Sequence, residues 1–143
     1  MLTIRRVLTV DKPISQVFAF LSDFTTTEEW DPGTVSTRLA SGDGGVGTAY
    51  ENVSSFLGRK TALTYVVQAH VAPTRLALRG ENRTLVAHDT MELRDLGGRT
   101  EVTYTARFDF KGKSRFAEPL LRLPLKKLGD DGRRGMLEAL QKL

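Results

Sequence analysis

The hydrophobic pattern at the start of the chain predicts one strand followed by two short helices. Residues 2–10 alternate between apolar and polar side chains, which is typical of a strand with one buried face. Apolar residues then recur at helical spacing over residues 14–23 and predict a first helix. Thr25 and Thr26 each precede a glutamate by the capping-box spacing, which predicts a second short helix that ends just after Trp30.

The middle of the chain has the pattern of an antiparallel sheet. Short turns rich in Gly, Pro and Asn separate the apolar runs, and connections this short favour hairpins. The only two histidines, His70 and His88, fall on the polar sides of their runs, so we expect both at the surface. The strands are expected at residues 35–40, 47–57, 60–72, 75–80, 84–95 and 100–110.

The end of the chain, residues 114–143, predicts one long helix that covers the apolar face of the sheet. Pro124 should bend or restart it. Gly129, Gly132 and Gly135 leave two interpretations open: a break near residues 130–131, or one helix whose small residues leave room for a bound molecule. The apolar positions are Phe116, Leu120, Leu123, Leu125, Leu128, Met136, Leu140 and Leu143.

These elements predict an α+β fold in a single domain over residues 1–143. A curved antiparallel sheet of about seven strands should wrap around the long C-terminal helix, with two short helices after the first strand. A strongly twisted sheet and a helix match poorly in shape. We therefore expect a cavity between the sheet and the C-terminal helix.

Composition narrows the function classes. No segment has the apolar length of a membrane span, and the N-terminal residues do not form a signal peptide, so we expect a cytoplasmic protein without integral membrane association. The lack of cysteine excludes disulfides, zinc–thiolate sites and thiol nucleophiles. Gly42, Gly44 and Gly47 have the spacing of a dinucleotide-binding loop, but a strand follows them where that loop requires a helix. We expect no cofactor, no metal and no catalytic motif.

The net charge of +4 is concentrated near the C-terminus. Residues 1–110 carry 12 Lys/Arg and 13 Asp/Glu, whereas residues 111–143 carry 9 and 4. Because no aromatic residues interleave with these cations, we interpret them as a solvated helix face and expect no nucleic-acid partner. A protein or membrane surface that binds this basic segment is a further hypothesis.

Asp89 is the most informative polar residue, because it shares the apolar face of residues 85–93 and a buried carboxyl group needs a partner. It has three interpretations: an ion pair with an arginine, a position at the open end of the sheet, or contact with a ligand.

Aromatic residues supply the other candidates. Tyr65 and Tyr104 each offer a ring to an apolar wall and a hydroxyl to a polar group, whereas the alternation does not fix the face of Tyr50. Trp30 is either a lid over a pocket or an anchor for the short helix. The residues that we expect to line a ligand site are Trp30, Tyr50, Tyr65, Asp89, Met91, Tyr104, Leu128 and Gly132.

Distinctive local sequences lie at residues 10–13, 17–18, 29–33, 45–48, 56–59, 73–76, 97–100, 102–104 and 119–143. These stretches and the order of the elements resemble the SRPBCC superfamily, also called START-like or Bet v 1-like, and within it the polyketide cyclase/dehydrase-type branch. The resemblance implies the helix-grip fold and a large apolar cavity for lipids, polyketides or similar molecules. We therefore expect the protein to bind a hydrophobic small molecule. The alternative is a polyketide cyclase/dehydrase-type enzyme, which would need acid–base groups in the cavity.

Overall fold

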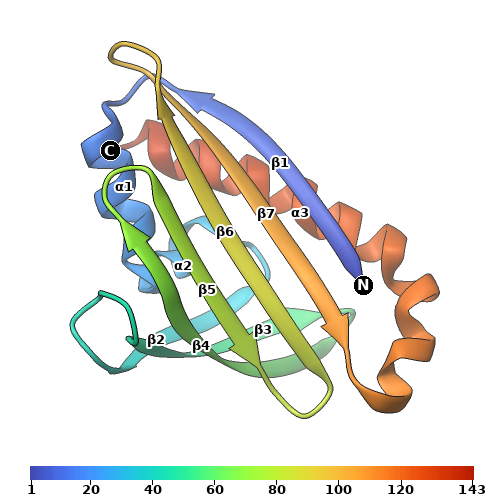
Figure 1. Ribbon diagram of the computed structural model, residues 1–143. Helices are drawn as coiled ribbons and strands as arrows, with labels where there is room; N and C mark the ends of the chain where they lie inside the picture. The colour runs from blue at the N-terminus through green and yellow to red at the C-terminus, as the bar shows by residue number, and fades with distance from the viewer.

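The computed structural model describes residues 1–143 as a seven-stranded antiparallel sheet that curves around one long helix (Figure 1). Its strand order is β1-β7-β6-β5-β4-β3-β2, so consecutive strands from β2 to β7 form hairpins and β1 closes the far edge. This is the predicted helix-grip fold. The strands are β1 (Leu2–Val10), β2 (Thr34–Ser41), β3 (Ala49–Phe56), β4 (Arg59–Val71), β5 (Arg75–Glu81), β6 (Leu85–Asp95) and β7 (Thr100–Phe110). The helices are α1 (Ile14–Ser22), η1 (Phe24–Thr26), α2 (Thr27–Trp30), η2 (Gly112–Ala117) and α3 (Glu118–Gln141).

Helix α3 is continuous, so the interpretation with a break near residues 130–131 is wrong. Two glycines allow close approach of its backbone. A Cβ atom at Gly129 would lie 2.5 Å from Ile4 Cγ2, and one at Gly135 would lie 2.0 Å from the carbonyl oxygen of Trp30. The space beside these two glycines is therefore filled by Ile4 and by the backbone of Trp30, not by a ligand. This packing offsets the low helix propensity of glycine. None of the helices combines the length and apolar content needed to cross a membrane.

Polar contacts hold α3 along β1. Arg6 donates from Nε to Asp130 Oδ1 at 2.8 Å and from Nη2 to the carbonyl oxygen of Lys126 at 3.2 Å. Arg133 Nε donates to the carbonyl oxygen of Val7 at 2.9 Å. The helix therefore lies along the edge strand and α2, which are its main neighbours.

The apolar residues of the C-terminal segment do not form one stripe, contrary to the prediction. Phe116, Leu120 and Leu123 are 73%, 80% and 76% exposed, whereas Leu125 and Met136 are buried. At about 100° of rotation per residue, Leu120 and Leu125 point about 140° apart on the helix. The later positions cover the sheet, and the first three face solvent.

A β-bulge in β4 places His70 on the helix-facing side of the sheet, not on the polar side that its alternation predicts, although His70 still lines a surface cleft. The register shifts just after Val67, so the two faces of the strand exchange beyond that point. Val71 is consequently exposed, and the His70 ring packs edge-on against Phe18 at 5.1 Å between ring centroids. His88 does lie on the outer face of β6, where it is half-buried.

The short helices after β1 are capped differently from the prediction. Asp23 Oδ1 accepts a hydrogen bond from the backbone N–H of Thr25 at 3.1 Å and begins η1. Glu28 Oε2 accepts from the backbone N–H of Thr37 in β2 at 2.8 Å, so it does not form a capping box. This bond joins α2 to the sheet.

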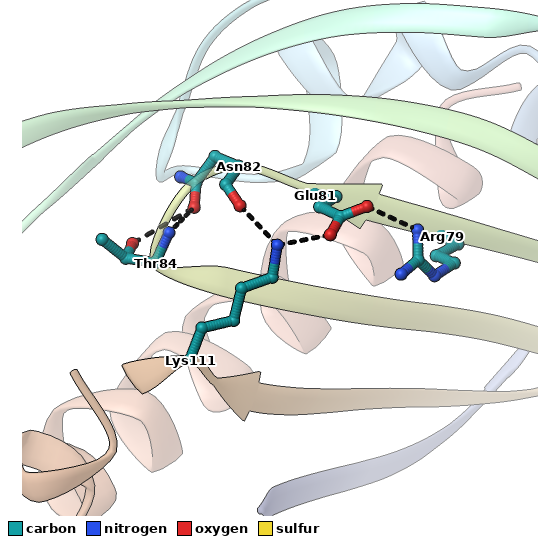
Figure 2. A network of polar contacts seen from close by, with 5 residues as sticks. All are labelled: Arg79, Glu81, Asn82, Thr84 and Lys111. Atoms are coloured by element: carbon teal, nitrogen blue, oxygen red, sulfur yellow. Dashed lines mark hydrogen bonds and ion pairs between the residues drawn. The ribbon is translucent and has the colours of Figure 1, made fainter. Parts of the chain in front are cut away.

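Figure 2 shows a polar network between the β5–β6 turn and the end of β7. Lys111 Nζ donates to the Glu81 carboxylate and, at 2.9 Å, to the carbonyl oxygen of Asn82. Arg79 Nη1 donates to the other Glu81 oxygen at 2.8 Å, while Asn82 Oδ1 accepts from the Thr84 N–H at 2.9 Å. The bonds from Lys111 and Arg79 lower the pKa of Glu81 to about 2. The network fixes the point from which η2 and α3 depart.

Candidate functional site

The helix-facing side of the sheet carries a buried carboxyl group that has no basic partner. Asp89 on β6 is 6% exposed and forms no ion pair, so the interpretation as an Arg–Asp pair is wrong. Pairing of β6 with β7 sets Tyr104 opposite Met91, two residues along from Asp89. The Tyr104 hydroxyl donates to Asp89 Oδ2 at 3.3 Å, which is long for an O–H···O hydrogen bond. The carboxyl group is therefore only weakly satisfied.

Burial changes the acidity of both groups. It raises the pKa of Asp89 from its usual 3.8 to about 7; the charge of Asp31 adds to this rise and the bond from Tyr104 opposes it. Burial also raises the pKa of Tyr104 well above its usual value of 10.0. At neutral pH the tyrosine is a hydrogen-bond donor, while Asp89 exists in both charged and neutral forms. Together they can donate to, or accept from, a polar group of a ligand.

Asp31, directly after α2, is a second acidic residue near this site. Its Oδ1 accepts from the Gly33 N–H and its Oδ2 from the Thr34 hydroxyl, both at 3.0 Å. Burial raises the pKa of Asp31, and these two bonds oppose the rise. Sequence reasoning did not select Asp31 as a site residue. The Asp-Pro-Gly turn was the available signal, but it does not show that Asp89 lies near.

A cavity of about 40 Å³ lies between the sheet and α3. A water molecule takes up about 30 Å³ of liquid, so the cavity has room for little more than one. The expectation of a large cavity is therefore wrong for this conformation. The lining residues are Ile4, Trp30, Asp31, Tyr104, Ala106, Phe108, Leu125, Leu128, Gly129 and Gly132.

The indole of Trp30 occupies the space next to this cavity. Trp30 is 3% exposed, and its ring meets Tyr104 edge-to-face at 5.6 Å between ring centroids. A Cβ atom at Gly132 would lie 3.9 Å from Trp30 Cζ3. Trp30 and Asp31 also line a surface cleft of about 370 Å³ beside the C-terminal end of α3. Trp30 and Asp31 therefore lie between this outer cleft and the inner cavity, and the buried indole anchors α2.

The remaining predicted site residues belong to the packed core. Tyr50 and Tyr65 pack around Phe24, with ring centroids 5.7 Å and 4.9 Å from it, and Met91 is fully buried. The structure thus settles the face of Tyr50, which points inward. Of the predicted residues, Trp30, Tyr104, Leu128 and Gly132 line the cavity, and Asp89 contacts one of them.

The sequence patterns did not identify the apolar wall of the cavity on β1 and β7. Ile4 on β1 and Ala106 and Phe108 on β7 line it. The alternation of these strands places all three on the apolar face, but it does not show which apolar residues remain beside a space. No group of three or more His, Asp or Glu side chains is arranged to hold a metal ion.

Comparisons with solved structures show the same fold. TTHA0849 from Thermus thermophilus aligns with a TM-score of 0.83 at 13% identity, covering 99% of this chain and 98% of that chain. The Zhui aromatase/cyclase from Streptomyces sp. R1128 aligns with a TM-score of 0.79 at 15% identity, covering 99% and 92%. A START superfamily protein from Mycobacterium smegmatis aligns with a TM-score of 0.75 at 13% identity, covering 98% and 94%.

Comparison with curated proteins finds no significant match. The family model described as "Polyketide cyclase / dehydrase and lipid transport" matches residues 1–143. The match spans the seven strands, the long helix and every residue of the site described above. The chain therefore belongs to the polyketide cyclase/dehydrase and lipid transport family.

Proposed function

We propose that the protein binds a hydrophobic small molecule between the sheet and α3, and that Asp89 and Tyr104 bind a hydroxyl or carbonyl group of that molecule. The observation that carries this proposal is the Asp89–Tyr104 pair, buried without a basic partner beside an apolar cavity. Burial of a polar pair is unfavourable unless its hydrogen bonds are complete. A ligand with one polar group would complete them.

Binding requires Trp30 to move, because ligand pockets usually enclose roughly 300–1,000 Å³ and this cavity encloses about 40 Å³. Trp30 ends the single-turn helix α2 and, with Asp31, lines both the cavity and the outer cleft, so displacement of its side chain would connect the two. Helix α2 is held to β2 by the Glu28 carboxylate. The side chain of Trp30 can therefore turn without loss of that attachment.

The size of the ligand follows from this requirement. Loss of the buried Trp30 contacts would cost about 3–5 kcal/mol, by analogy with large-to-small core substitutions. A ligand that buries about 300 Å² of apolar surface gains about 7 kcal/mol at 25 cal/mol per Å². The gain from burying the ligand exceeds the cost of displacing Trp30 by only a small free energy. We therefore expect a ligand with several rings or a long chain.

A second candidate function is catalysis of the polyketide cyclase/dehydrase type on such a ligand. The observation that favours it is the pKa of Asp89, which burial raises to about 7. A carboxyl group that titrates near neutral pH is suited to general acid–base catalysis. Asp89 would exchange a proton with the ligand, and Tyr104 would orient the polar group.

Native mass spectrometry of the freshly purified protein, followed by organic extraction, tests the binding proposal. We expect an apolar molecule bound near one equivalent. Gly132→Leu should lower its occupancy because the added side chain enters the space beside Trp30. Arg134→Leu, on the exposed side of the same helix, is the matched control. A wild-type protein that is empty and takes up neither octadecanoic acid nor 2-naphthol would overturn the proposal.

A further inference from the structure

One end of the C-terminal segment presents apolar side chains to solvent. Figure 1 shows η2 and the first turns of α3 projecting beyond the sheet. Phe116, Leu120 and Leu123 lie there, and each is at least 73% exposed. Single exposed apolar residues are ordinary, but Leu120 and Leu123 are neighbours on α3 and Phe116 precedes them in η2, so three large apolar side chains are exposed at one end of the segment. The apolar side chains of this part of the segment therefore face solvent and do not pack on the sheet.

The same segment is rich in cations. Residues 111–127 carry six Lys/Arg and one Asp/Glu, whereas the whole chain has a net charge of +4, so the rest of the chain is slightly acidic. Lys111 is bound to Glu81 and Lys127 to Asp131. The cations of the segment that form no ion pair are Lys113, Arg115, Arg122 and Lys126. With Phe116, Leu120 and Leu123 these four residues form what we call the basic apolar face.

We propose that the basic apolar face docks the protein on the surface of an anionic lipid bilayer. An interfacial helix inserts its apolar side chains at the headgroup boundary while its Lys and Arg side chains bind anionic headgroups. The mixture of three large apolar residues and four unpaired cations fits such a surface. A second copy of the chain would instead bring two basic faces together, which is electrostatically unfavourable. This inference does not depend on whether the cavity binds a ligand.

Co-sedimentation with phosphatidylcholine vesicles, with and without phosphatidylserine, tests the docking at low and high salt. We expect binding only to the vesicles with phosphatidylserine, and loss of binding at high salt. The triple variant Lys113→Gln/Arg122→Gln/Lys126→Gln should lower the partition coefficient on the order of a hundredfold. The double variant Leu120→Ser/Leu123→Ser should lower it about tenfold or more, because less apolar surface inserts.

Matched controls remove the same groups elsewhere. The triple variant Arg38→Gln/Lys60→Gln/Arg83→Gln removes three exposed cations from other parts of the surface, and Val46→Ser removes an exposed apolar side chain from a loop. We expect both to bind vesicles within about threefold of wild type, since they leave the basic apolar face intact. Every exposed substitution should leave the midpoint of urea unfolding unchanged.

Three results would overturn the inference. Wild-type protein that stays in solution with phosphatidylserine vesicles at low salt is the first. Equal loss of binding in the control triple variant and in the variant of the basic apolar face is the second, because it indicates diffuse charge attraction. The third is a dimer, seen by light scattering, that Leu120→Ser/Leu123→Ser dissociates, because a second copy would then cover this face.

Discussion

Replacement of Asp89 by asparagine should stabilise the protein at pH 8 and change its stability little near pH 4. Burial raises the pKa of Asp89 to about 7, against a usual value of 3.8. The unfolded chain therefore releases this proton at lower pH than the folded protein, and wild-type stability falls as the pH rises from about 4 to about 7. Three pKa units at 1.36 kcal/mol each amount to about 4 kcal/mol. Asparagine stays neutral and keeps an oxygen for the Tyr104 hydroxyl.

Urea unfolding between pH 4 and pH 8 measures this effect. Trp30 is the only tryptophan and is 3% exposed, so its fluorescence reports unfolding directly. Wild type should lose about 4 kcal/mol relative to Asp89→Asn over this range, and the loss should level off above pH 7. Glu92→Gln, on the outer face of the same strand, is the control and should follow wild type.

One result would refute the reasoning behind this prediction. If Asp89→Asn and wild type lose stability in parallel from pH 4 to pH 8, Asp89 is already ionised in the folded protein at low pH. The same conclusion follows if the variant is no more stable than wild type at pH 8. Asp89 would then be well solvated or paired, and its proposed contact with a ligand would lose its physical basis.

Three further predictions concern the contacts around Trp30. Gly135→Ala should lower the free energy of unfolding by about 3 kcal/mol, because its Cβ would lie 2.0 Å from a backbone oxygen. Gly132→Ala should instead raise the free energy of unfolding by up to about 1 kcal/mol. Equal effects of the two variants in urea unfolding would contradict this. Tyr104→Phe should lower the free energy of unfolding by about 1 kcal/mol and raise the pKa of Asp89 further, so that the fall in stability extends to higher pH. A fall in stability over the same pH range as in wild type would argue against the Tyr104–Asp89 hydrogen bond. Trp30→Ala should lower the free energy of unfolding by about 3–5 kcal/mol. In calorimetry the variant should bind 2-naphthol more tightly than wild type does. Weaker binding would show that the indole does not occupy the space of the ligand.

The strands and their order could be predicted from the sequence because alternation and turn residues act locally. Strand β7 occupies residues 100–110, the range that its alternation predicts. The prediction failed beyond Val67 in β4, where a bulge reverses the two faces. A bulge adds one residue without a distinctive sequence at that point, so local pattern alone does not locate it.

The candidate site was only partly predictable. Asp89 could be placed on the buried face because it interrupts an apolar pattern, and Tyr104 for a similar reason. The position of Trp30 inside the fold and the approach of Asp31 to Asp89 depend on how α2 packs against the sheet and α3. Helical spacing likewise identified the apolar residues of α3, such as Leu120, but it does not show which side of the helix meets the sheet.

The central claim is that a hydrophobic ligand binds between the sheet and α3, and an NMR titration with 2-naphthol tests it most directly. The single indole N–H signal belongs to Trp30, and backbone amides report the other positions. We expect saturable shifts at the Trp30 indole and at the amides of Tyr104 and Gly132, which line the cavity. Shifts confined to the separate surface cleft beside Asp43 and His70, or no shifts at all, would contradict the claim.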